Sequence, residues 1–229
     1  MCGRFTQMFS WRELWKLYNI ASPMPMEDRR PDYNVAPTRE VPVVRVRDEQ
    51  KEVALLRWGL VPFFAKGVPG PYSTINARLE SIAKTPSYRG PWKRSQRCIL
   101  PVSGFYEWHL TPDNKKQPFY ITCTDQNIFG LAGLWDRSVR EDGIAIESCT
   151  IITMPANSLM HDIHNTGSSP HRMPAILAAN DADAWLGGTV EQAQDSLKRY
   201  PADLMVAWPV STRVNTPTNN DAQLIAAHP

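Results

Sequence analysis

The sequence lacks the features that mark a membrane-spanning, secreted or metal-binding protein. Its longest apolar runs are far shorter than the roughly 20 residues that a transmembrane helix needs. The stretch Met1–Phe5 has no charged lead before an apolar segment, so we expect no secretory signal. The four cysteines form no C-x-x-C pair and are expected to be free thiols in a reducing compartment; they are Cys2, Cys98, Cys123 and Cys149. We therefore predict a cytoplasmic protein that makes no membrane contact.

The net charge is only +2, but the charges are unevenly distributed. Residues 1–100 hold 17 Lys/Arg against 9 Asp/Glu, whereas residues 101–229 hold 8 against 14. A basic half of this kind can attract a polyanion such as nucleic acid. Chance segregation of solvated charges would give the same pattern, so the charge alone does not choose between these interpretations.

The chain also lacks internal repeats, low-complexity tracts, a linker and regular alternation of strands with helices. Strand candidates dominate, and the 20 prolines favour strands, turns and long connections over a helical bundle. We predict one α+β domain over residues 1–229, built on a bent, barrel-like, largely antiparallel β-sheet with peripheral helices. The clearest predicted elements are a helix over Ser10–Tyr18 with a Ser10/Glu13 capping box, a hairpin of Val41–Arg47 and Val53–Trp58 around the turn Asp48–Glu52, and helices over Ala156–Met160, Ala182–Leu186 and Val190–Tyr200.

Cys2 is the first residue with a distinctive chemistry. Initiator methionine is usually removed before a small residue, which would leave an α-amine and a thiol on Cys2. Their reference pKa values, about 7.7–8.0 and about 8.5, make both available as nucleophiles near neutral pH. Such a 1,2-aminothiol condenses with an aldehyde, first to an imine and then to a thiazolidine ring. The alternative is that Cys2 is an incidental small residue near the chain end.

Two further segments combine polar groups suited to catalysis or binding. Glu107 lies among aromatic residues, where partial burial would raise its pKa and suit it to proton transfer. Asn76, Arg78 and Glu80 place an amide, a guanidinium and a carboxylate within five residues, which could orient a nucleophile or hold a phosphate. An exposed strand glutamate and a surface turn with an Arg–Glu pair are the alternatives.

Three of the five histidines, His161, His164 and His171, fall within eleven residues. The first two have H-x-x-H spacing, but no third ligand and no H-E-x-x-H motif accompany them, so we predict no metal site. A histidine that acts as general acid or base, or that orients a substrate hydroxyl, fits better. Exposed loop histidines without a function are the alternative.

Taken together and in this order, the motifs resemble those of the SRAP family, the SOS response-associated peptidase or abasic site processing proteins. The resemblance covers about residues 2–215 and leaves a C-terminal tail, 216–229. The motifs are Cys2–Phe5, Tyr33–Thr38, Trp58–Pro62, Asn76–Glu80, Gly104–Trp108, Ile163-His164 and Arg172–Pro174.

The resemblance implies a DNA-repair function in which the protein binds single-stranded DNA and crosslinks to the ring-opened aldehyde of an abasic site. Cys2 would be the nucleophile and Asn76 would orient its amine. Glu107 would shuttle protons, and His164 would assist sugar ring opening. The activity would be that of a lyase-like crosslinking enzyme that protects the lesion, with autopeptidase activity as an addition. No cofactor is implied, because a condensation needs neither redox chemistry nor a metal.

The expected partner is single-stranded DNA that contains abasic sites, with the replication machinery as a further candidate. The protein is expected to be a monomer that associates with the nucleoid when it is bound to DNA. Arginines would contact phosphates without reading sequence, and aromatic rings would stack on bases unless they pack in the core. The predicted DNA-binding residues are Arg4, Asn34, Phe63, Phe64, Arg78 and Thr153.

The histidine motif departs from the family pattern. The family usually has a histidine almost directly before Arg-Met-Pro, whereas here residues 165–170 separate His164 from His171 and Arg172. Either the segment is a looped insertion that leaves His164 in place, or His171 takes the role. The context Ile163-His164-Asn165 favours His164.

Two other functions compete with abasic-site crosslinking. In a cysteine peptidase, Cys2, His164 and Asn76 would form a nucleophile, base and orienting group, and only the thiol would be needed. In a non-enzymatic single-strand DNA module, the arginines and aromatic residues would bind DNA without covalent chemistry. The latter predicts equal affinity for intact and abasic strands.

Overall fold

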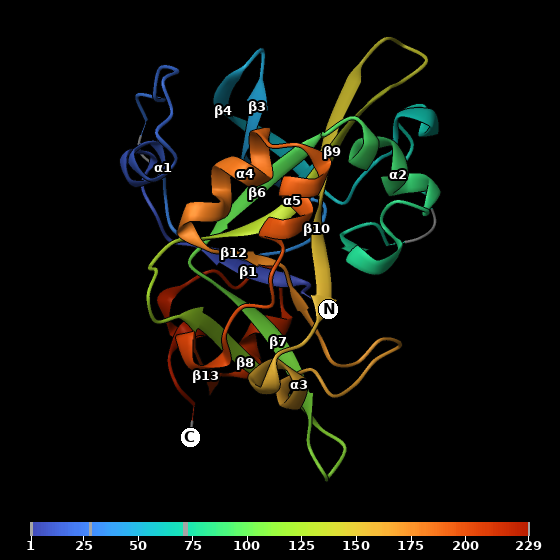
Figure 1. The fold of residues 1–229 in the computed structure, drawn as a ribbon. Helices are drawn as coiled ribbons and strands as arrows, with labels where there is room; N and C mark the ends of the chain where they lie inside the picture. The colour runs from blue at the N-terminus through green and yellow to red at the C-terminus, as the bar shows by residue number, and fades with distance from the viewer. Residues whose placement is uncertain (1, 28, 71–72, 229) are drawn as a thin grey trace.

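A computed structural model describes residues 2–27, 29–70 and 73–228, whose strands form two sheets (Figure 1). The five-stranded sheet has the order β13-β8-β7-β1-β2. Its strands are β1 (Arg4–Gln7), β2 (Asp32–Val35), β7 (Gly104–Leu110), β8 (Lys116–Cys123) and β13 (Met205–Pro209).

The second sheet has the order β11-β10-β4-β3-β6-β9-β12, and β5 pairs with β10 beside this path. Because β9 also pairs with β10, the path β10-β4-β3-β6-β9 returns to its start and closes a five-stranded barrel. The strands are β3 (Glu40–Arg47), β4 (Gln50–Trp58), β5 (Asn76–Arg78), β6 (Arg97–Val102), β9 (Phe129–Val139), β10 (Ala145–Pro155), β11 (Arg172–Pro174) and β12 (Ile176–Leu177).

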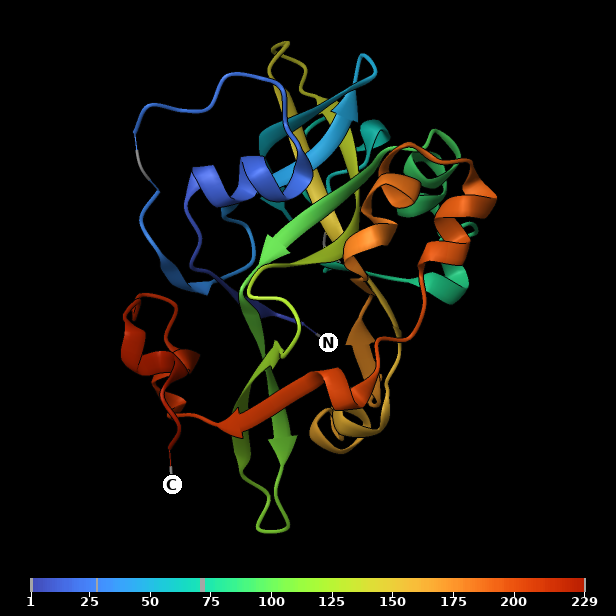
Figure 2. The same ribbon diagram turned by 60° about the vertical axis from the view of Figure 1, so that its left-hand side comes forward.

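The helices are short and lie around the sheets (Figures 1 and 2). Helix α4 contacts β3 and β6, α2 contacts β9, and α3 contacts β7 and β11. The α-helices are α1 (Trp11–Tyr18), α2 (Pro86–Lys93), α3 (Ser158–Ile163), α4 (Ala182–Gly187) and α5 (Val190–Ser196). No helix among the described residues is long and apolar enough to cross a membrane.

This architecture confirms the predicted fold class, α+β with a barrel-like and largely antiparallel sheet, although the strands divide between two sheets. The parallel pairings among the described strands are those of β10 with β4 and with β5. Val43, Leu56 and Leu100 lie on the same face of β3, β4 and β6 and are fully buried. Their alternation with outward-facing residues along each strand is the pattern of a closed sheet around a packed core.

The capping box predicted for the first helix is present. The Ser10 side chain accepts a hydrogen bond from the Glu13 amide at 3.3 Å, and the Glu13 carboxylate accepts one from the Ser10 amide at 2.8 Å. Leu14 and Tyr18 are buried on the face that packs against the core. Asn19 ends the helix in the left-handed conformation, which this residue type tolerates.

The predicted hairpin forms, but its turn is tighter than the sequence indicated. Asp48 and Glu49 both have positive φ, 49° and 62°, and Arg47 pairs directly with Gln50. A two-residue turn with two left-handed residues matches the twist of the flanking strands. Residues 50–52, assigned to the turn because they are polar, therefore belong to β4.

The later helices also shift from their predicted bounds. Helix α5 begins with a Thr189/Gln192 capping box and ends at Ser196 rather than at the predicted Tyr200. Helix α3 runs over Ser158–Ile163 and not over Ala156–Met160, because Asn157 caps its N-terminus by accepting from the Met160 amide. A side chain that caps the start of a helix fixes its N-terminal bound more sharply than apolar spacing does.

Candidate active site

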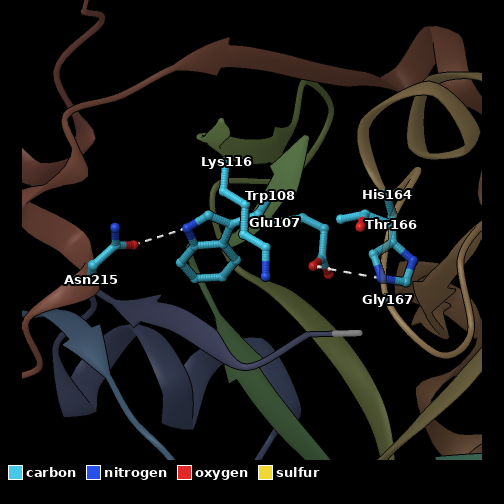
Figure 3. Close-up of a pocket in the computed structure, with 7 residues that line it drawn as sticks. All are labelled: Glu107, Trp108, Lys116, His164, Thr166, Gly167 and Asn215. Carbon is cyan, nitrogen blue, oxygen red and sulfur yellow. Dashed lines mark hydrogen bonds and ion pairs between the residues drawn. The ribbon is translucent and has the colours of Figure 1, made fainter. Parts of the chain in front are cut away.

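A cavity of about 390 Å³ opens where β7, β8 and the segment after α3 meet. Strand β7 brings Glu107 and Trp108, and the segment after α3 brings His164 (Figure 3). The cavity volume lies in the range of small-ligand sites. Its lining residues are Glu107, Trp108, Lys116, His164, Thr166, Gly167 and Asn215.

Cys2 lies next to strand β1 and is buried, with 1% of its surface exposed. The Asn76 side-chain amide donates a hydrogen bond to the Cys2 carbonyl oxygen at 2.9 Å. Asn76 is itself held by strand β5, and the Tyr88 hydroxyl donates to its carbonyl oxygen at 3.0 Å. The asparagine amide therefore fixes the backbone of the residue that carries the candidate nucleophile.

Burial raises the pKa of the Cys2 thiol to about 12, and the nearby Glu107 carboxylate contributes to this shift. A thiolate is the reactive form of cysteine, so the Cys2 sulfur is not pre-activated in this environment. The contribution of Glu107 to this shift also means that its carboxylate lies close to the Cys2 sulfur. This proximity follows from the pairing of β1 with β7, in which Arg4 lies opposite Tyr106.

Glu107 is 4% exposed, and burial raises the pKa of its carboxyl above the ordinary value. A carboxyl group whose pKa is moved toward neutrality can both donate and accept protons at working pH. The aromatic neighbours of Glu107 in the sequence indicate the same effect. In Figure 3 the carboxylate points toward the His164 ring.

His164 is 4% exposed and lies 3.9 Å from Glu107, measured from Nε2 to Oε1. Its Nδ1 accepts a hydrogen bond from the Arg172 backbone amide at 3.1 Å. Since Nδ1 is the acceptor, the neutral ring carries its proton on Nε2, the nitrogen that faces Glu107. Burial, followed by surrounding positive charge, lowers the pKa of His164 to about 4, so the ring is neutral at pH 7.

His171, the alternative histidine, is exposed and lies outside the cavity lining. Its ring stacks on that of His161, with centroids 3.9 Å apart and planes 13° from parallel. Its backbone amide donates to the His164 carbonyl oxygen at 2.7 Å, which closes the loop between them. Of the two candidates, His164 is thus the one beside Glu107.

The loop of residues 165–170 is anchored at both sides of the site. Asn165 accepts a hydrogen bond from the Leu110 amide at 2.8 Å and donates one to the Leu110 carbonyl oxygen at 3.0 Å. Ser169 accepts a hydrogen bond from the Arg78 guanidinium. The loop thus connects His164, which lines the cavity, to His171, which does not.

Arg172 and Glu80 form a bidentate ion pair near the site. The Arg172 guanidinium donates to both carboxylate oxygens of Glu80 at 3.0 and 2.8 Å, and to the Thr153 carbonyl oxygen at 2.8 Å. This contact lowers the pKa of Glu80. A bidentate pair of this kind fixes orientation as well as adding energy. It ties β11, which follows the His164 loop, to the end of β5.

Two of the predicted DNA-binding residues do not fit that role. Asn34 is fully buried, and its amide donates to the carbonyl oxygens of Val214, Thr216 and Asn219. Thr153 is also fully buried and accepts from Arg172 at 3.3 Å. Both side chains hold the protein together, and Asn34 does so by securing the C-terminal segment that brings Asn215 to the cavity.

The other predicted DNA-binding residues are accessible to different degrees. Phe63 and Phe64 are 56% and 52% exposed, and their rings meet edge to face at a centroid distance of 5.5 Å. The Arg94 guanidinium lies 5.2 Å above the Phe63 ring. Arg78 is exposed, whereas Arg4 is half-buried and donates to the Gly3 carbonyl oxygen at 3.1 Å. The alternative that the two phenylalanines pack in the core is therefore wrong.

Sequence reasoning missed Lys116 and Asn215 as site residues. Asn215 accepts a hydrogen bond from the Trp108 indole at 2.9 Å, and no sequence signal connects these two positions. Lys116 pairs directly with Leu110 across the β7–β8 hairpin.

The histidine cluster shows no metal-binding geometry. Within residues 2–27, 29–70 and 73–228, no group of three His, Cys, Asp or Glu side chains is arranged to hold a metal ion. The stacking of His161 on His171 instead uses the ring faces, which carry no lone pairs.

The lowered pKa of His164 predicts a pH-dependent stability. Below pH 6.5 the unfolded chain binds a proton at this ring, whereas the folded protein does so only near pH 4. The free energy of unfolding therefore falls as the pH drops from about 6.5 toward 4, by at most about 1.4 kcal/mol per pH unit from this group. Urea titrations at several pH values should give a shallower dependence for His164→Asn than for the wild type. Equal slopes for the two proteins would contradict the assignment.

The closed barrel carries a site in which Asn76 holds the buried Cys2 and Glu107 faces His164. The family profile described as "SOS response associated peptidase (SRAP)" matches residues 1–217. The chain belongs to the SRAP family.

Named relatives and a solved structure agree with this assignment. The chain is 37% identical over its full length to all of the abasic site processing protein YoqW of Bacillus subtilis (strain 168). It is 31% identical to the abasic site processing protein HMCES of Xenopus tropicalis, over 86% of this chain and 66% of that protein. A crystal structure of a protein from Bacteroides thetaiotaomicron superposes with a TM-score of 0.82 at 28% identity, over 99% of this chain and 100% of that one.

Proposed function

We propose that this protein processes abasic sites in single-stranded DNA by forming a covalent crosslink between Cys2, freed of Met1, and the ring-opened sugar aldehyde. Relatives across the whole chain carry the name abasic site processing protein. The observation that carries the proposal is the convergence of Cys2, Asn76, Glu107 and His164 from four separate segments. Each has a part in condensing an aminothiol with an aldehyde.

The reaction is a condensation that releases one water. The Cys2 α-nitrogen attacks the aldehyde carbon, and loss of the carbonyl oxygen as water leaves a C=N bond. The Cys2 sulfur then adds to the imine carbon, and the thiol proton ends on the nitrogen. The five-membered thiazolidine that results blocks the aldehyde, which would otherwise promote strand cleavage.

The site offers a group for each proton transfer. Glu107 would take protons from the amine and the thiol and return them to the leaving oxygen and the nitrogen, a role that its raised pKa supports. His164, neutral with a proton on Nε2, would act at the sugar hydroxyl during ring opening. Asn76 would hold the Cys2 backbone so that the amine meets the aldehyde in one orientation.

A cysteine peptidase is supported less well by the same residues. A peptidase thiol needs a lowered pKa, whereas burial raises the pKa of the Cys2 thiol to about 12. The Asn76 amide donates to the Cys2 carbonyl oxygen, and His164 Nδ1 accepts from a backbone amide, so neither forms the orienting contact of a peptidase triad. Attack by the amine before the thiol agrees better with a neutral, buried sulfur.

The test incubates protein shown by mass to lack Met1 with a single strand that carries one abasic site. We expect a band that survives heating on a denaturing gel. A matched strand with a tetrahydrofuran in place of the abasic sugar has no aldehyde and should give no band. If the aldehyde strand also gives no band, crosslinking is not the function.

A form that retains a residue before Cys2 separates the crosslinking and peptidase activities. Its thiol is present but its Cys2 nitrogen is an amide, so thiazolidine formation should be blocked. Cleavage of a peptide substrate by this form, without trapping of abasic DNA, would show a peptidase activity that is independent of crosslinking.

A monomeric state and contact with the replication machinery stay predictions.

Accessible aromatic rings and cations would hold the strand. Arg78 and Arg4 would contact phosphates, and Phe63 and Phe64 would stack on bases, which every base sequence permits. Asn34 and Thr153 are left out of this set because their side chains are buried.

Replacing Phe63 and Phe64 by alanine should weaken single-strand binding without loss of fold, because both rings are exposed. Each stacked base is worth about 1–3 kcal/mol, so roughly tenfold or more should be lost for each ring that stacks. Fluorescence anisotropy with the tetrahydrofuran strand measures the change. Leu55→Ala, which removes an equally exposed apolar side chain from β4, is the control. Unchanged affinity in the double variant would argue against stacking.

A further inference from the structure

We propose that Lys116 and the adjoining wall of the cavity form a subsite for a DNA phosphate next to the abasic sugar. The inference rests on the proposed function and names one contact by which the strand is held at the site. Lys116 lies in the acidic half of the sequence, where the charge distribution gives no hint of a DNA contact.

The register of the β7–β8 hairpin fixes the direction of Lys116. Leu110 pairs with Lys116 and Trp108 pairs with Pro118, and directly opposed residues share one face of a sheet. Residues 108 and 110 also share a face, so Lys116 projects to the same side as Trp108. Both side chains line the cavity with Glu107. In Figure 3 the ammonium ends between the Trp108 ring and the Glu107 carboxylate.

The charge of Lys116 is available for a ligand. Among the described residues no carboxylate forms an ion pair with it, whereas the adjacent Lys115 is 2.7 Å from Asp113. The guanidinium of Arg172, whose backbone amide contacts His164, is committed to Glu80. An ammonium at the mouth of a site, with no anionic partner, attracts an anion from solution.

A phosphate is the anion that the proposed substrate must bring to this place. Every sugar within a strand carries a phosphate on each side, so a sugar that reaches Cys2 brings phosphates to the surrounding walls. A lysine binds phosphate as a point charge and reads no base, as a lesion in any sequence requires. The Thr166 hydroxyl lines the same cavity and can donate a further hydrogen bond.

The ammonium also offsets an unfavourable charge in the site. Glu107 is a carboxyl group in the same cavity, and in its ionised form it would repel an approaching phosphate. Lys116 places a positive charge in the same cavity, so the strand can enter without protonation of Glu107. Such a contact is electrostatic and therefore depends on salt concentration.

The test measures the affinity for the tetrahydrofuran strand as a function of salt. Each phosphate neutralised on a single strand contributes about 0.7 to the slope of log affinity against log salt concentration. We expect Lys116→Ala to reduce that slope by about 0.7 and to weaken binding several-fold at low salt. Lys116→Arg should keep the slope. Lys115→Ala, which removes the neighbouring charge that is paired with Asp113, should change neither quantity.

With the abasic strand, the DNA concentration that gives half-maximal crosslinking should rise in Lys116→Ala by the same factor as the dissociation constant. A variant that binds more weakly with the wild-type slope overturns the inference, because the loss would then come from altered packing. Equal affinity and slope in variant and wild type overturn it as well. Absence of crosslinking by the wild type would instead sink the proposed function, while the tetrahydrofuran strand still tests the phosphate contact.

Discussion

Replacing Cys2 by alanine should reduce the heat-stable adduct with abasic single-stranded DNA to background. Alanine keeps the α-amine after removal of Met1 but has no sulfur to close the ring. The imine that remains is reversible and hydrolyses when the protein is denatured. Denaturing gels with and without borohydride measure both species, because borohydride converts an imine into a stable amine.

The two gels give the variant a distinctive outcome. Cys2→Ala should show a band only when borohydride is present, and Cys2→Ser should behave in the same way. Wild-type protein should show the band in both gels. A heat-stable band from Cys2→Ala without borohydride would mean that another nucleophile carries the reaction. Because Cys2 is small and buried, comparison of unfolding midpoints is needed to show that the variants fold.

Replacing Glu107 by glutamine should slow crosslinking by about 10²–10⁴-fold at saturating DNA, the usual contribution of a positioned general acid or base. Glutamine has nearly the same shape but cannot exchange protons. Single-turnover rates over a range of pH measure the effect. Burial raises the pKa of Glu107 above 4.5, so the wild-type rate should change at a pH above that value, and the variant should lose this step.

The stability of the same variant provides an independent control. A folded-state pKa above the unfolded value means that folding favours the protonated carboxyl, so this group costs stability as the pH rises from 4.5 through the raised pKa. Glu107→Gln should therefore be at least as stable as the wild type at neutral pH. A slow variant that is also strongly destabilised would point to a structural role for Glu107 instead.

Local chemistry made part of the fold predictable. The Ser10/Glu13 and Thr189/Gln192 capping boxes form because their partners are three residues apart and need no distant contact. The hairpin of β3 and β4 followed from its apolar alternation. Its turn did not, because polar residues occur both in turns and in exposed parts of strands. Helix α2, with Pro91 inside it, has no clear local signal and forms against β9.

The candidate site divides in the same way. The type of chemistry at Cys2, Glu107 and His164 could be argued from the residues and from the resemblance. The burial of Glu107 could also be argued from its aromatic neighbours. The burial of Cys2 and His164 could not, and it raises the pKa of the thiol to about 12 and lowers that of the imidazole to about 4. Asn34 was misread for a related reason. An asparagine next to a motif looks like a ligand contact until its three backbone acceptors, about 180 residues further along the chain, are located.

The sequence by itself determined the family and the largely antiparallel α+β architecture, and it pointed to Cys2 and His164 as candidate site residues. These follow from the identity of residues and from spacings of a few positions, which are local properties of the chain. Only the tertiary structure decided that Asn34 and Thr153 are internal, that Phe63 and Phe64 are exposed, and that Lys116 faces the cavity. Those outcomes depend on which distant strands pair and in which register, and hydrogen bonds across a sheet leave no mark on neighbouring residues in the sequence.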